Sequence, residues 1–287
     1  MRESRTVVLI TGASSGIGEA TARLFAAEGF RVFGTRLPAH RDDPAARASA
    51  VEPAGVEMVE LEVDSDASVR RCVDEVHARA GRIDVLVNNA GVMHVGFAEE
   101  TAPETARAVF DTNFFGAVRM TGAVLPEMRK NRRGRIVNIG SLAAWVGEPG
   151  QAIYSASKRA LAGYTEALHY EVWPLGIHVS LVEPGLFRTG ILRTALGAAD
   201  AIPDYDTARE NAVRTLTASS GRGHDPQQLA RLLLRIVNSR SPRLRYGAGF
   251  EAHWLPYLKV LLPQRLFGRT LRRAYGIRRE GQRRASA

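Results

Sequence analysis

Tyr154 and Lys158 are the residues whose types and spacing most clearly indicate chemistry. Residues four positions apart share one face of a helix, and the pattern from Tyr154 to Trp173 predicts a helix. A free tyrosine is a weak acid with a pKa near 10, but an adjacent ammonium group favours the phenolate and lowers that pKa. We therefore expect the pair to exchange a proton with a hydroxyl or carbonyl oxygen while a hydride moves to or from carbon.

The scarcity of lysine argues that this pair is not a coincidence of the surface. The 39 basic residues include only three lysines, Lys130, Lys158 and Lys259, and only Tyr154 among seven tyrosines has a lysine four residues on. The planar fork of arginine does not replace a compact ammonium charge. Ser141 follows a predicted strand, and its hydroxyl is expected to hydrogen-bond the oxygen that reacts.

A glycine-rich turn, Thr11-Gly12-Ala13-Ser14-Ser15-Gly16-Ile17-Gly18, directly follows the first apolar run and opens a predicted helix. Glycines at such a junction let the backbone approach a pyrophosphate, which lies on the helix N-terminus. The same string satisfies the G-x-S-x-G elbow of α/β-hydrolases, but that elbow follows a strand in the middle of the sheet. The position after the first strand therefore favours dinucleotide binding, with a turn used only for packing as the remaining alternative.

The order and spacing of these motifs resemble the short-chain dehydrogenase/reductase family over roughly residues 6–190. The resemblance implies a catalytic tetrad of Asn113, Ser141, Tyr154 and Lys158, in which Lys158 also binds the nicotinamide ribose and Asn113 steadies a water that relays protons. It also implies that Asn88–Gly91 lies beside the adenosine, that Asp64 ends the third strand and contacts adenine, and that residues 184–189 border the nicotinamide. The predicted cofactor-binding residues are Gly12, Ser14, Ser15, Gly16, Ile17, Gly18, Arg36, Asp64, Asn89, Ala90, Gly91, Tyr154, Lys158, Pro184, Gly185 and Thr189.

Arg36 stands where an acidic residue would close the second strand and hold a ribose 2′-hydroxyl. A guanidinium group there would instead bind a 2′-phosphate bidentately, with Arg41 assisting from the following loop. The sequence therefore predicts NADP(H) in preference to NAD(H). A solvated role for Arg36 stays open, because family members that prefer NADP(H) often carry a second basic residue before the middle glycine, where this chain has Ser15.

The residues expected beyond the nicotinamide are largely apolar, and they suit a bulky lipophilic ketone or secondary alcohol. The predicted substrate-binding residues are His94, Leu142, Trp145, Phe187 and Ile191. Pro242–Tyr246 and the basic, apolar segment after it loosely resemble the hydroxysteroid and retinol dehydrogenase branch, which implies steroid-, retinoid- or polyketide-like substrates. No Cys/His cluster has metal-ligand spacing, so no metal is expected.

Short apolar runs alternate with longer helical patterns, which predicts an α/β, Rossmann-type, doubly wound parallel sheet with helices on both faces. We expect one dinucleotide-binding catalytic domain over residues 1–253, with a substrate loop at about 186–227, and a basic amphipathic helical extension over 254–287. The predicted strands are 6–10, 31–35, 56–63, 83–87, 135–139 and 177–182, with 244–246 as an edge strand, and the predicted helices are 16–28, 67–80, 103–128, 154–173 and 228–238.

The formal net charge of +9 is concentrated in the last quarter of the chain, where residues 222–287 hold fifteen basic and three acidic residues. Pro263 is expected to divide the basic segment Trp254–Tyr275 into two short helices. That segment could cap the substrate cleft or the subunit, lie on an anionic membrane, or bind a partner. Nucleic acid is not expected, because recognition modules and stacking stripes are absent from the sequence.

The single cysteine and the lack of any long uncharged apolar stretch predict a soluble, cytoplasmic protein, with peripheral membrane contact as an option. The resemblance implies a dimer or tetramer formed through the two long helices. A non-catalytic dinucleotide-binding scaffold or sensor, acting through the basic tail, is the alternative to an oxidoreductase. Such a sensor would have no need of Tyr154 and Lys158 together, so the tetrad favours the enzyme.

Overall fold

A parallel sheet forms the centre of the computed structural model, which describes residues 5–38, 53–192, 195–197 and 201–277. Its seven strands have the order β3-β2-β1-β4-β6-β7-β9, and all neighbouring strands run in the same direction. They are Val7–Ile10 (β1), Arg31–Arg36 (β2), Val56–Glu60 (β3), Val85–Asn88 (β4), Gly134–Ile139 (β6), Ile177–Pro184 (β7) and Arg245–Ala248 (β9). Two residues at His94–Val95 (β5) pair separately with Leu196–Gly197 (β8).

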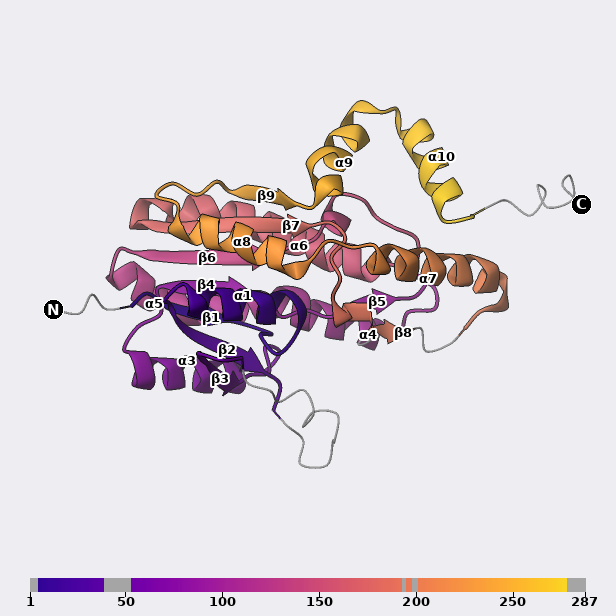
Figure 1. The fold of residues 1–287 in the computed structure, drawn as a ribbon. Coiled ribbons are helices and arrows are strands. Elements are labelled where there is room, and N and C mark those ends of the chain that lie inside the picture. Colours follow the sequence, from indigo (N-terminus) through magenta and orange to yellow (C-terminus); the bar gives the residue numbers. More distant parts are fainter. Residues whose placement is uncertain (1–4, 39–52, 193–194, 198–200, 278–287) are drawn as a thin grey trace, which may run out of the picture.

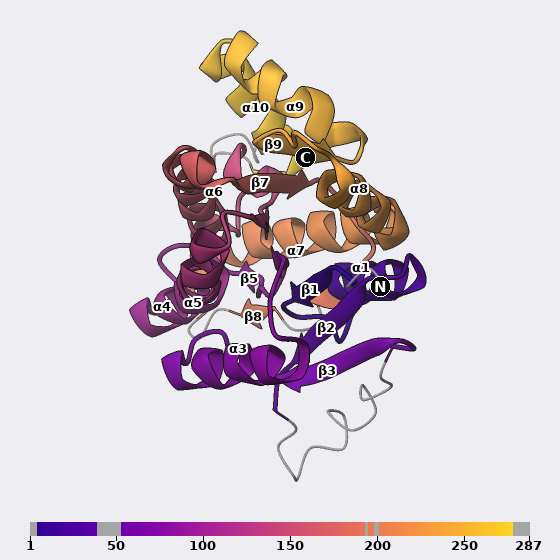
Figure 2. The ribbon, with the colours of Figure 1, turned by 90° about the vertical axis from the view of Figure 1, so that its left-hand side faces the viewer.

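Helices cover both faces of this sheet (Figures 1 and 2). One apolar layer lies between the sheet and the pair Gly16–Ala27 (α1) and Pro226–Asn238 (α8). The other lies against Asp66–Ala80 (α3), Gly116–Lys130 (α5) and Ala152–Val172 (α6). Strands buried on both faces require continuous apolar sequence, and β1 and β4 are wholly buried. The predicted doubly wound α/β fold is confirmed.

The predicted helix over 103–128 is interrupted in the structure. The chain forms Pro103–Phe110 (α4), then one π-helical turn at Asp111–Phe115, and then α5. A π turn inserts one extra residue into the helical hydrogen-bond pattern, and such turns are frequent at functional sites. Here the wider turn contains Asn113, which is 2% exposed. The periodicity of apolar residues does not reveal this interruption, because the helix continues on both sides.

The segment predicted as a loop at 186–227 contains a long helix, Asp206–Gly221 (α7), after short turns at Gly190–Leu192 and Pro203–Tyr205. Arg209 of α7 forms an ion pair with the wholly buried carboxylate of Glu100. Glu100 also accepts a hydrogen bond from the Ile202 backbone at 2.8 Å, so α7 is anchored to the β5 region.

Two helices project from the body as a hairpin after β9 (Figure 1). They are Phe250–Leu261 (α9) and Gln264–Ala274 (α10), with Pro263 as the cap residue before α10. The division at Pro263 agrees with the prediction, while α9 begins four residues before the predicted segment. Across the described ranges, none of the helices is both long and apolar enough to span a bilayer.

Candidate active site

The predicted site residues follow four strands that all end at the carboxyl edge of the sheet. The carboxyl ends of β1, β4, β6 and β7 lead into Thr11, Asn89, Gly140 and Gly185 respectively. The strand order reverses between β1 and β4, which are neighbours, and ligands of open α/β sheets bind outside the carboxyl ends at such a point. The motifs that lie far apart in the sequence therefore meet at the position where this fold offers a crevice.

The glycine turn adopts a backbone that requires glycine at two positions. Gly12 and Gly16 have φ values of +65° and +56°, which side chains with a Cβ rarely adopt. A Cβ on Gly18 would lie 2.1 Å from the carbonyl oxygen of Gly12, so the helix could not pack so closely on the turn. The first turn of α1 begins at Gly16 and presents its N–H groups at this point, which fits a pyrophosphate.

Thr11, Thr35 and Asn89 hold the turn in place. The side chain of Asn89 donates hydrogen bonds to the carbonyl oxygens of Thr11 and Gly12 at 2.9 and 3.0 Å. The Thr11 hydroxyl accepts from the backbone of Asn89 and Ala90 at 2.9 Å, and that of Thr35 accepts from Gly12 at 3.1 Å. Asn89 is one of the predicted cofactor-binding residues, and in the structure its side-chain amide shapes the turn.

Tyr154 and Ser141 meet at the end of β6. Tyr154 lies near the N-terminus of α6, is 6% exposed, and its hydroxyl is hydrogen-bonded to Ser141. Ser141 caps a short helix at Leu142–Ala144 by accepting from the Ala143 backbone at 3.1 Å. This cap fixes the serine side chain, so the two hydroxyl groups are placed to share one oxygen of a bound molecule.

Lys158 lies one turn along α6 from Tyr154, as the spacing predicts. Its Nζ donates to the carbonyl oxygen of Ile139 at 2.9 Å and stands 5.9 Å from the centroid of the Tyr154 ring. Because Lys158 is 5% exposed, burial lowers the pKa of its ammonium group to about 8. A Cβ added to Gly91 would be 3.5 Å from this Nζ, which brings the Asn88–Gly91 motif to the same place.

The expected lowering of the tyrosine pKa by Lys158 is wrong, because the pKa of Tyr154 is raised. Burial raises the pKa of Tyr154, the hydrogen bond from Ser141 lowers it, and the charge of Glu148 raises it further. Desolvation disfavours the charged phenolate, and Lys158 directs its ammonium group to the carbonyl of Ile139. Tyr154 is therefore held as a neutral phenol, which is the form that can donate a proton.

Asn113 lies in the π turn and connects two parts of the site. Its amide donates to the Val92 carbonyl oxygen at 2.9 Å and to the Ser157 hydroxyl at 3.1 Å. Its carbonyl oxygen accepts from the Val92 backbone at 2.8 Å. Val92 follows Gly91, and Ser157 precedes Lys158, so the asparagine fixes the β4 motif against the helix that carries the lysine.

Other predicted cofactor residues lie at or after the carboxyl ends of further strands. Arg36 ends β2 directly after Thr35, and it is half-buried. The side chain of Thr189 lies against Gly16, where an added Cβ would be 3.4 Å away, and Pro184 is the last residue of β7. Asp64 is exposed and lies in a turn four residues after β3, because that strand ends at Glu60 and not at the predicted residue 63. The predicted helper Arg41 lies outside the described residues.

The structure separates the predicted substrate-binding residues into two groups. Leu142 follows Ser141 directly, and Ile191 is half-buried in the turn after Thr189. His94 has no exposed surface, and its Nε2 faces the Thr101 hydroxyl at 3.4 Å. Phe187 belongs to the apolar layer under α1 and α8. His94 and Phe187 therefore lie in packed surroundings, and their contact with substrate stays a prediction.

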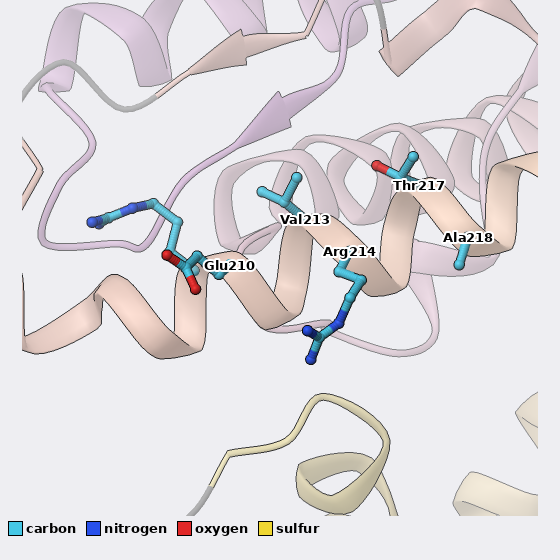
Figure 3. Close-up of a pocket in the computed structure, with 6 residues that line it drawn as sticks. Glu210, Val213, Arg214, Thr217 and Ala218 are labelled. Atoms are coloured by element: carbon cyan, nitrogen blue, oxygen red, sulfur yellow. The ribbon is translucent and has the colours of Figure 1, made fainter.

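Trp145, the fifth predicted substrate residue, joins the loop after β6 to the edge of the sheet. The guanidinium group of Arg245 lies 5.4 Å from the centroid of the Trp145 ring, and the Trp145 side chain is hydrogen-bonded to Glu183. The indole therefore packs toward β7 and β9. A separate hollow of about 570 Å³ lies on α7 (Figure 3), lined by Arg209, Glu210, Val213, Arg214, Thr217 and Ala218. None of the predicted site residues lines it.

Comparison with known proteins decides the family. The family model described as short chain dehydrogenase matches residues 6–198, which include the glycine turn, Asn113, Ser141, Tyr154 and Lys158. The chain belongs to the short-chain dehydrogenases. It is therefore an oxidoreductase of the type that acts on alcohol and ketone groups, as the motifs predicted.

Similar proteins extend over nearly the whole chain. A 3-ketodihydrosphingosine reductase from Bacteroides thetaiotaomicron is 37% identical and covers 95% of this chain and 98% of its own length. Human 17-beta-hydroxysteroid dehydrogenase type 1 is 33% identical, covering 90% of this chain and 81% of its own. A short-chain dehydrogenase from Burkholderia phymatum, solved in complex with NAD, is 26% identical with a TM-score of 0.75 and covers 94% and 97%.

Several residues that shape this short-chain dehydrogenase site were not singled out from the sequence. Thr35 and Ser157 are small hydroxyl residues with many counterparts elsewhere in the chain, so only their tertiary contacts distinguish them. Thr11 could have been found, because it opens the glycine motif that was recognised. Glu148 lies in the loop between Ser141 and Tyr154, and its charge acts on the pKa of Tyr154.

Proposed function

We propose that this protein is an NADPH-dependent reductase of bulky, lipophilic ketones, and that Tyr154 is its proton donor. The observation that carries the proposal is the buried Tyr154 phenol, hydrogen-bonded to Ser141, with the Lys158 ammonium group on the same helix face. A raised tyrosine pKa favours the phenol over the phenolate. Reduction of a ketone needs an acid at the carbonyl oxygen, so this protonation state suits reduction.

Each member of the tetrad has a separate task in this proposal. The Ser141 and Tyr154 hydroxyl groups hydrogen-bond the substrate carbonyl oxygen and hold it in place. As negative charge develops on that oxygen, Tyr154 transfers its phenolic proton to it. The Lys158 ammonium group stabilises the negative charge that remains on the tyrosine oxygen, and Asn113 keeps the helix and the β4 motif in register.

The residues at the crevice fit a nicotinamide dinucleotide. Gly12, Gly16 and Gly18 form the cradle for the pyrophosphate, and the segment from Pro184 to Thr189 reaches the same turn through Gly16. Such a cofactor, when bound, supplies the hydride for the carbonyl carbon. We propose that Arg36 selects NADP(H) over NAD(H), because it ends β2 next to Thr35, whose hydroxyl holds the glycine turn.

The proposed substrate class rests on the apolar neighbours of Ser141 and on the relatives. Leu142 adjoins the serine, and Ile191 follows the segment that borders the crevice. The names of similar proteins refer to a ketodihydrosphingosine and a hydroxysteroid. Both are largely apolar molecules with one reacting oxygen, and an apolar lining suits such a molecule.

The oxidation of NADPH, followed by fluorescence with a panel of ketones of increasing size and apolarity, tests the proposed function. We expect turnover with long-chain or polycyclic ketones and weaker activity with small polar ones. A protein that binds NADPH but consumes none of it across the panel would instead support the alternative of a dinucleotide-binding scaffold or sensor.

The cofactor preference is expected to reverse in the variant Arg36→Asp. The carboxylate would repel a 2′-phosphate and accept a hydrogen bond from a ribose 2′-hydroxyl. We expect the ratio of kcat/KM for NADPH to that for NADH to fall by about 100-fold, the loss of a bidentate charged contact. Arg129→Asp makes the same charge change at an exposed position on α5 and should leave the ratio unchanged. A wild-type protein that already has the lower KM for NADH would contradict the assignment.

We further propose that the hairpin α9–α10 contacts an anionic membrane, where a lipophilic substrate accumulates. Phe250, Trp254, Tyr257 and Leu261 form one stripe along α9, and three of them are 70% to 78% exposed. The exposed arginines of α10 are Arg265, Arg269, Arg272 and Arg273. Apolar and aromatic groups next to basic ones are typical of helices that lie in the membrane interface.

Sedimentation with vesicles tests the membrane contact. We expect wild-type protein to bind phosphatidylglycerol-containing vesicles and to bind pure phosphatidylcholine vesicles poorly. The double variant Tyr257→Glu/Leu261→Glu should bind these vesicles at least about tenfold more weakly, because two large apolar side chains no longer enter the interface. Tyr170→Glu, at an exposed position on α6, is the control. Equal binding of the double variant and wild type would dispose of this contact.

A homo-oligomer formed through the long helices is also part of the proposal. Phe115 at the end of the π turn and Trp173 after α6 are 46% and 65% exposed. Large apolar side chains on helices of this length are suited to a subunit interface. Light scattering of the purified protein gives the subunit number directly.

A further inference from the structure

The hairpin α9–α10 is attached to the segment that joins the proposed serine and tyrosine. Lys259 of α9 donates a hydrogen bond to the carbonyl oxygen of Trp145. Tyr275, the residue that ends α10, is hydrogen-bonded through its hydroxyl group to the carboxylate of Glu148. Both contacts fall between Ser141 and Tyr154, so the position of the hairpin is coupled to the loop that carries the reacting groups.

Tyr275 is buried at the end of a helix that is otherwise open to solvent. It is 5% exposed, whereas α10 itself contains no buried residue. A buried tyrosine hydroxyl normally requires a hydrogen-bond partner, and Glu148 provides one. Burial and the adjacent Glu148 both raise the pKa of Tyr275. The hydroxyl therefore stays protonated and donates to the carboxylate.

Glu148 is held in position from its other side. The side chain of Gln151 donates to its Oε2 at 2.6 Å, and the backbone of Gln151 donates to the Glu148 carbonyl oxygen at 3.0 Å. The carboxylate is also close enough to Tyr154 to raise the pKa of the phenol. The proposed reaction makes no use of Glu148, so its contacts with the hairpin need another explanation.

A third contact joins the hairpin to α7, which lies within the predicted substrate loop at 186–227. Asn211 of α7 donates to the carbonyl oxygen of Gly276 at 3.4 Å, and Figure 3 shows the end of the hairpin, in yellow, on the side of α7 toward which Arg214 points. The buried Ala212 of α7 lies beside Gly150, which belongs to the same loop as Glu148. A Cβ added to Gly150 would be 3.3 Å from the Cβ of Ala212. The hairpin end, α7 and the loop after Ser141 therefore converge.

We propose that the hairpin α9–α10 is a lid over the substrate site and that Tyr275 is the latch that holds it closed on Glu148. Tyr275 is a positioning residue in this scheme, because it acts through the loop and not on the substrate. Closure would keep water away from the reacting carbonyl, and opening would admit a large substrate. The identity of the substrate beneath the lid rests on the proposed function, whereas the closure of the hairpin does not.

Limited digestion with trypsin tests the latch without any turnover. The exposed arginines of α10 include Arg269 and Arg272, and cleavage there follows the population of the opened hairpin. Tyr275→Phe keeps the ring and removes the hydroxyl, so we expect cleavage about tenfold faster than in wild type. Tyr257→Phe is the matched control, a tyrosine of the same hairpin that is 70% exposed.

A double-mutant cycle separates a latch from a general loss of packing. Glu148→Leu should open the hairpin as much as Tyr275→Phe does, and the double variant should open it no further, because both single variants remove the same bond. Additive effects, or cleavage of Tyr275→Phe at the wild-type rate, would overturn the latch. Thermal unfolding of each variant shows whether the body remains intact.

Thiol labelling tests whether the hairpin covers the site. Cys72 is buried, and burial raises the pKa of its thiol to about 12, so it reacts slowly. A reporter thiol introduced as Leu142→Cys stands beside Ser141. We expect N-ethylmaleimide to label it about tenfold faster in the Tyr275→Phe background than in the Tyr257→Phe background. Equal rates would overturn the lid, whatever the outcome of the ketone panel.

Discussion

Tyr154→Phe is expected to reduce kcat for ketone reduction by about 1,000-fold, within the range that a positioned general acid contributes. The substitution removes only the phenolic oxygen, which is hydrogen-bonded to Ser141 and is the proposed proton donor. Lys158 and Asn113 keep their own partners, which are the carbonyl oxygens of Ile139 and Val92. The dissociation constant for NADPH, measured by fluorescence titration, should therefore change by no more than about twofold.

The matched control for this variant is Tyr170→Phe, on the same helix but 64% exposed, which should retain wild-type kcat. The two variants differ in whether the lost hydroxyl lies at the carboxyl edge of the sheet. If Tyr154→Phe kept a kcat within about threefold of wild type, another group would have to supply the proton. Loss of NADPH binding in that variant would indicate a structural role for the tyrosine.

The architecture could be read from the sequence because each of its determinants is local. Runs such as Val7–Ile10 are apolar without alternation, which is the signature of strands buried on both faces. Glycines at the β1–α1 junction and the Tyr154–Lys158 spacing are equally local. The parallel sheet then brings all strand ends to one edge, so the tetrad and the glycine turn could be placed together without coordinates.

The features that the sequence did not predict depend on contacts between distant segments. The π turn places Asn113 within hydrogen-bond distance of Ser157, which lies on another helix, and the apolar periodicity of the sequence does not predict the turn. His94 is followed by ordinary loop residues in the sequence, yet the structure encloses it completely. The bond between Glu148 and Tyr275 joins two polar residues that no motif connects.

The protonation state of the site is the most instructive difference. Spacing alone places an ammonium group next to Tyr154, and on that basis a lowered tyrosine pKa is a reasonable expectation. Burial acts on both groups, however, and it disfavours the charged form of each: it raises the pKa of the phenol and lowers that of the ammonium group. The extent of burial is a property of the assembled fold, so the sequence could not supply it.

The same burial makes Lys158 costly for stability, and Lys158→Met is expected to show it. A fall in the lysine pKa from 10.5 to about 8 corresponds to about 3 kcal/mol of unfavourable burial of the charge. Methionine preserves the apolar stem and leaves the Ile139 carbonyl oxygen without its donor, which costs about 1 kcal/mol. We expect the cofactor-free variant to be more stable at pH 7 by about 2 kcal/mol in free energy of unfolding, while it loses ketone reduction.

The dependence of that gain on pH distinguishes a buried charge from a change in packing. Below about pH 8 the lysine is charged in both the folded and the unfolded wild-type protein, so the full penalty is present. Between about pH 8 and 10.5 the unfolded state binds more protons than the folded one, so wild-type stability relative to the variant rises with pH. The advantage of Lys158→Met, measured by urea unfolding, should therefore be largest at neutral pH and shrink toward pH 10, whereas exposed Lys130→Met should show no such trend. A variant no more stable than wild type at pH 7 would mean that the fold holds this ammonium group without a penalty and does not lower its pKa. The expected result instead identifies Lys158 as a residue that is kept at the expense of stability because the reaction at Tyr154 requires its charge.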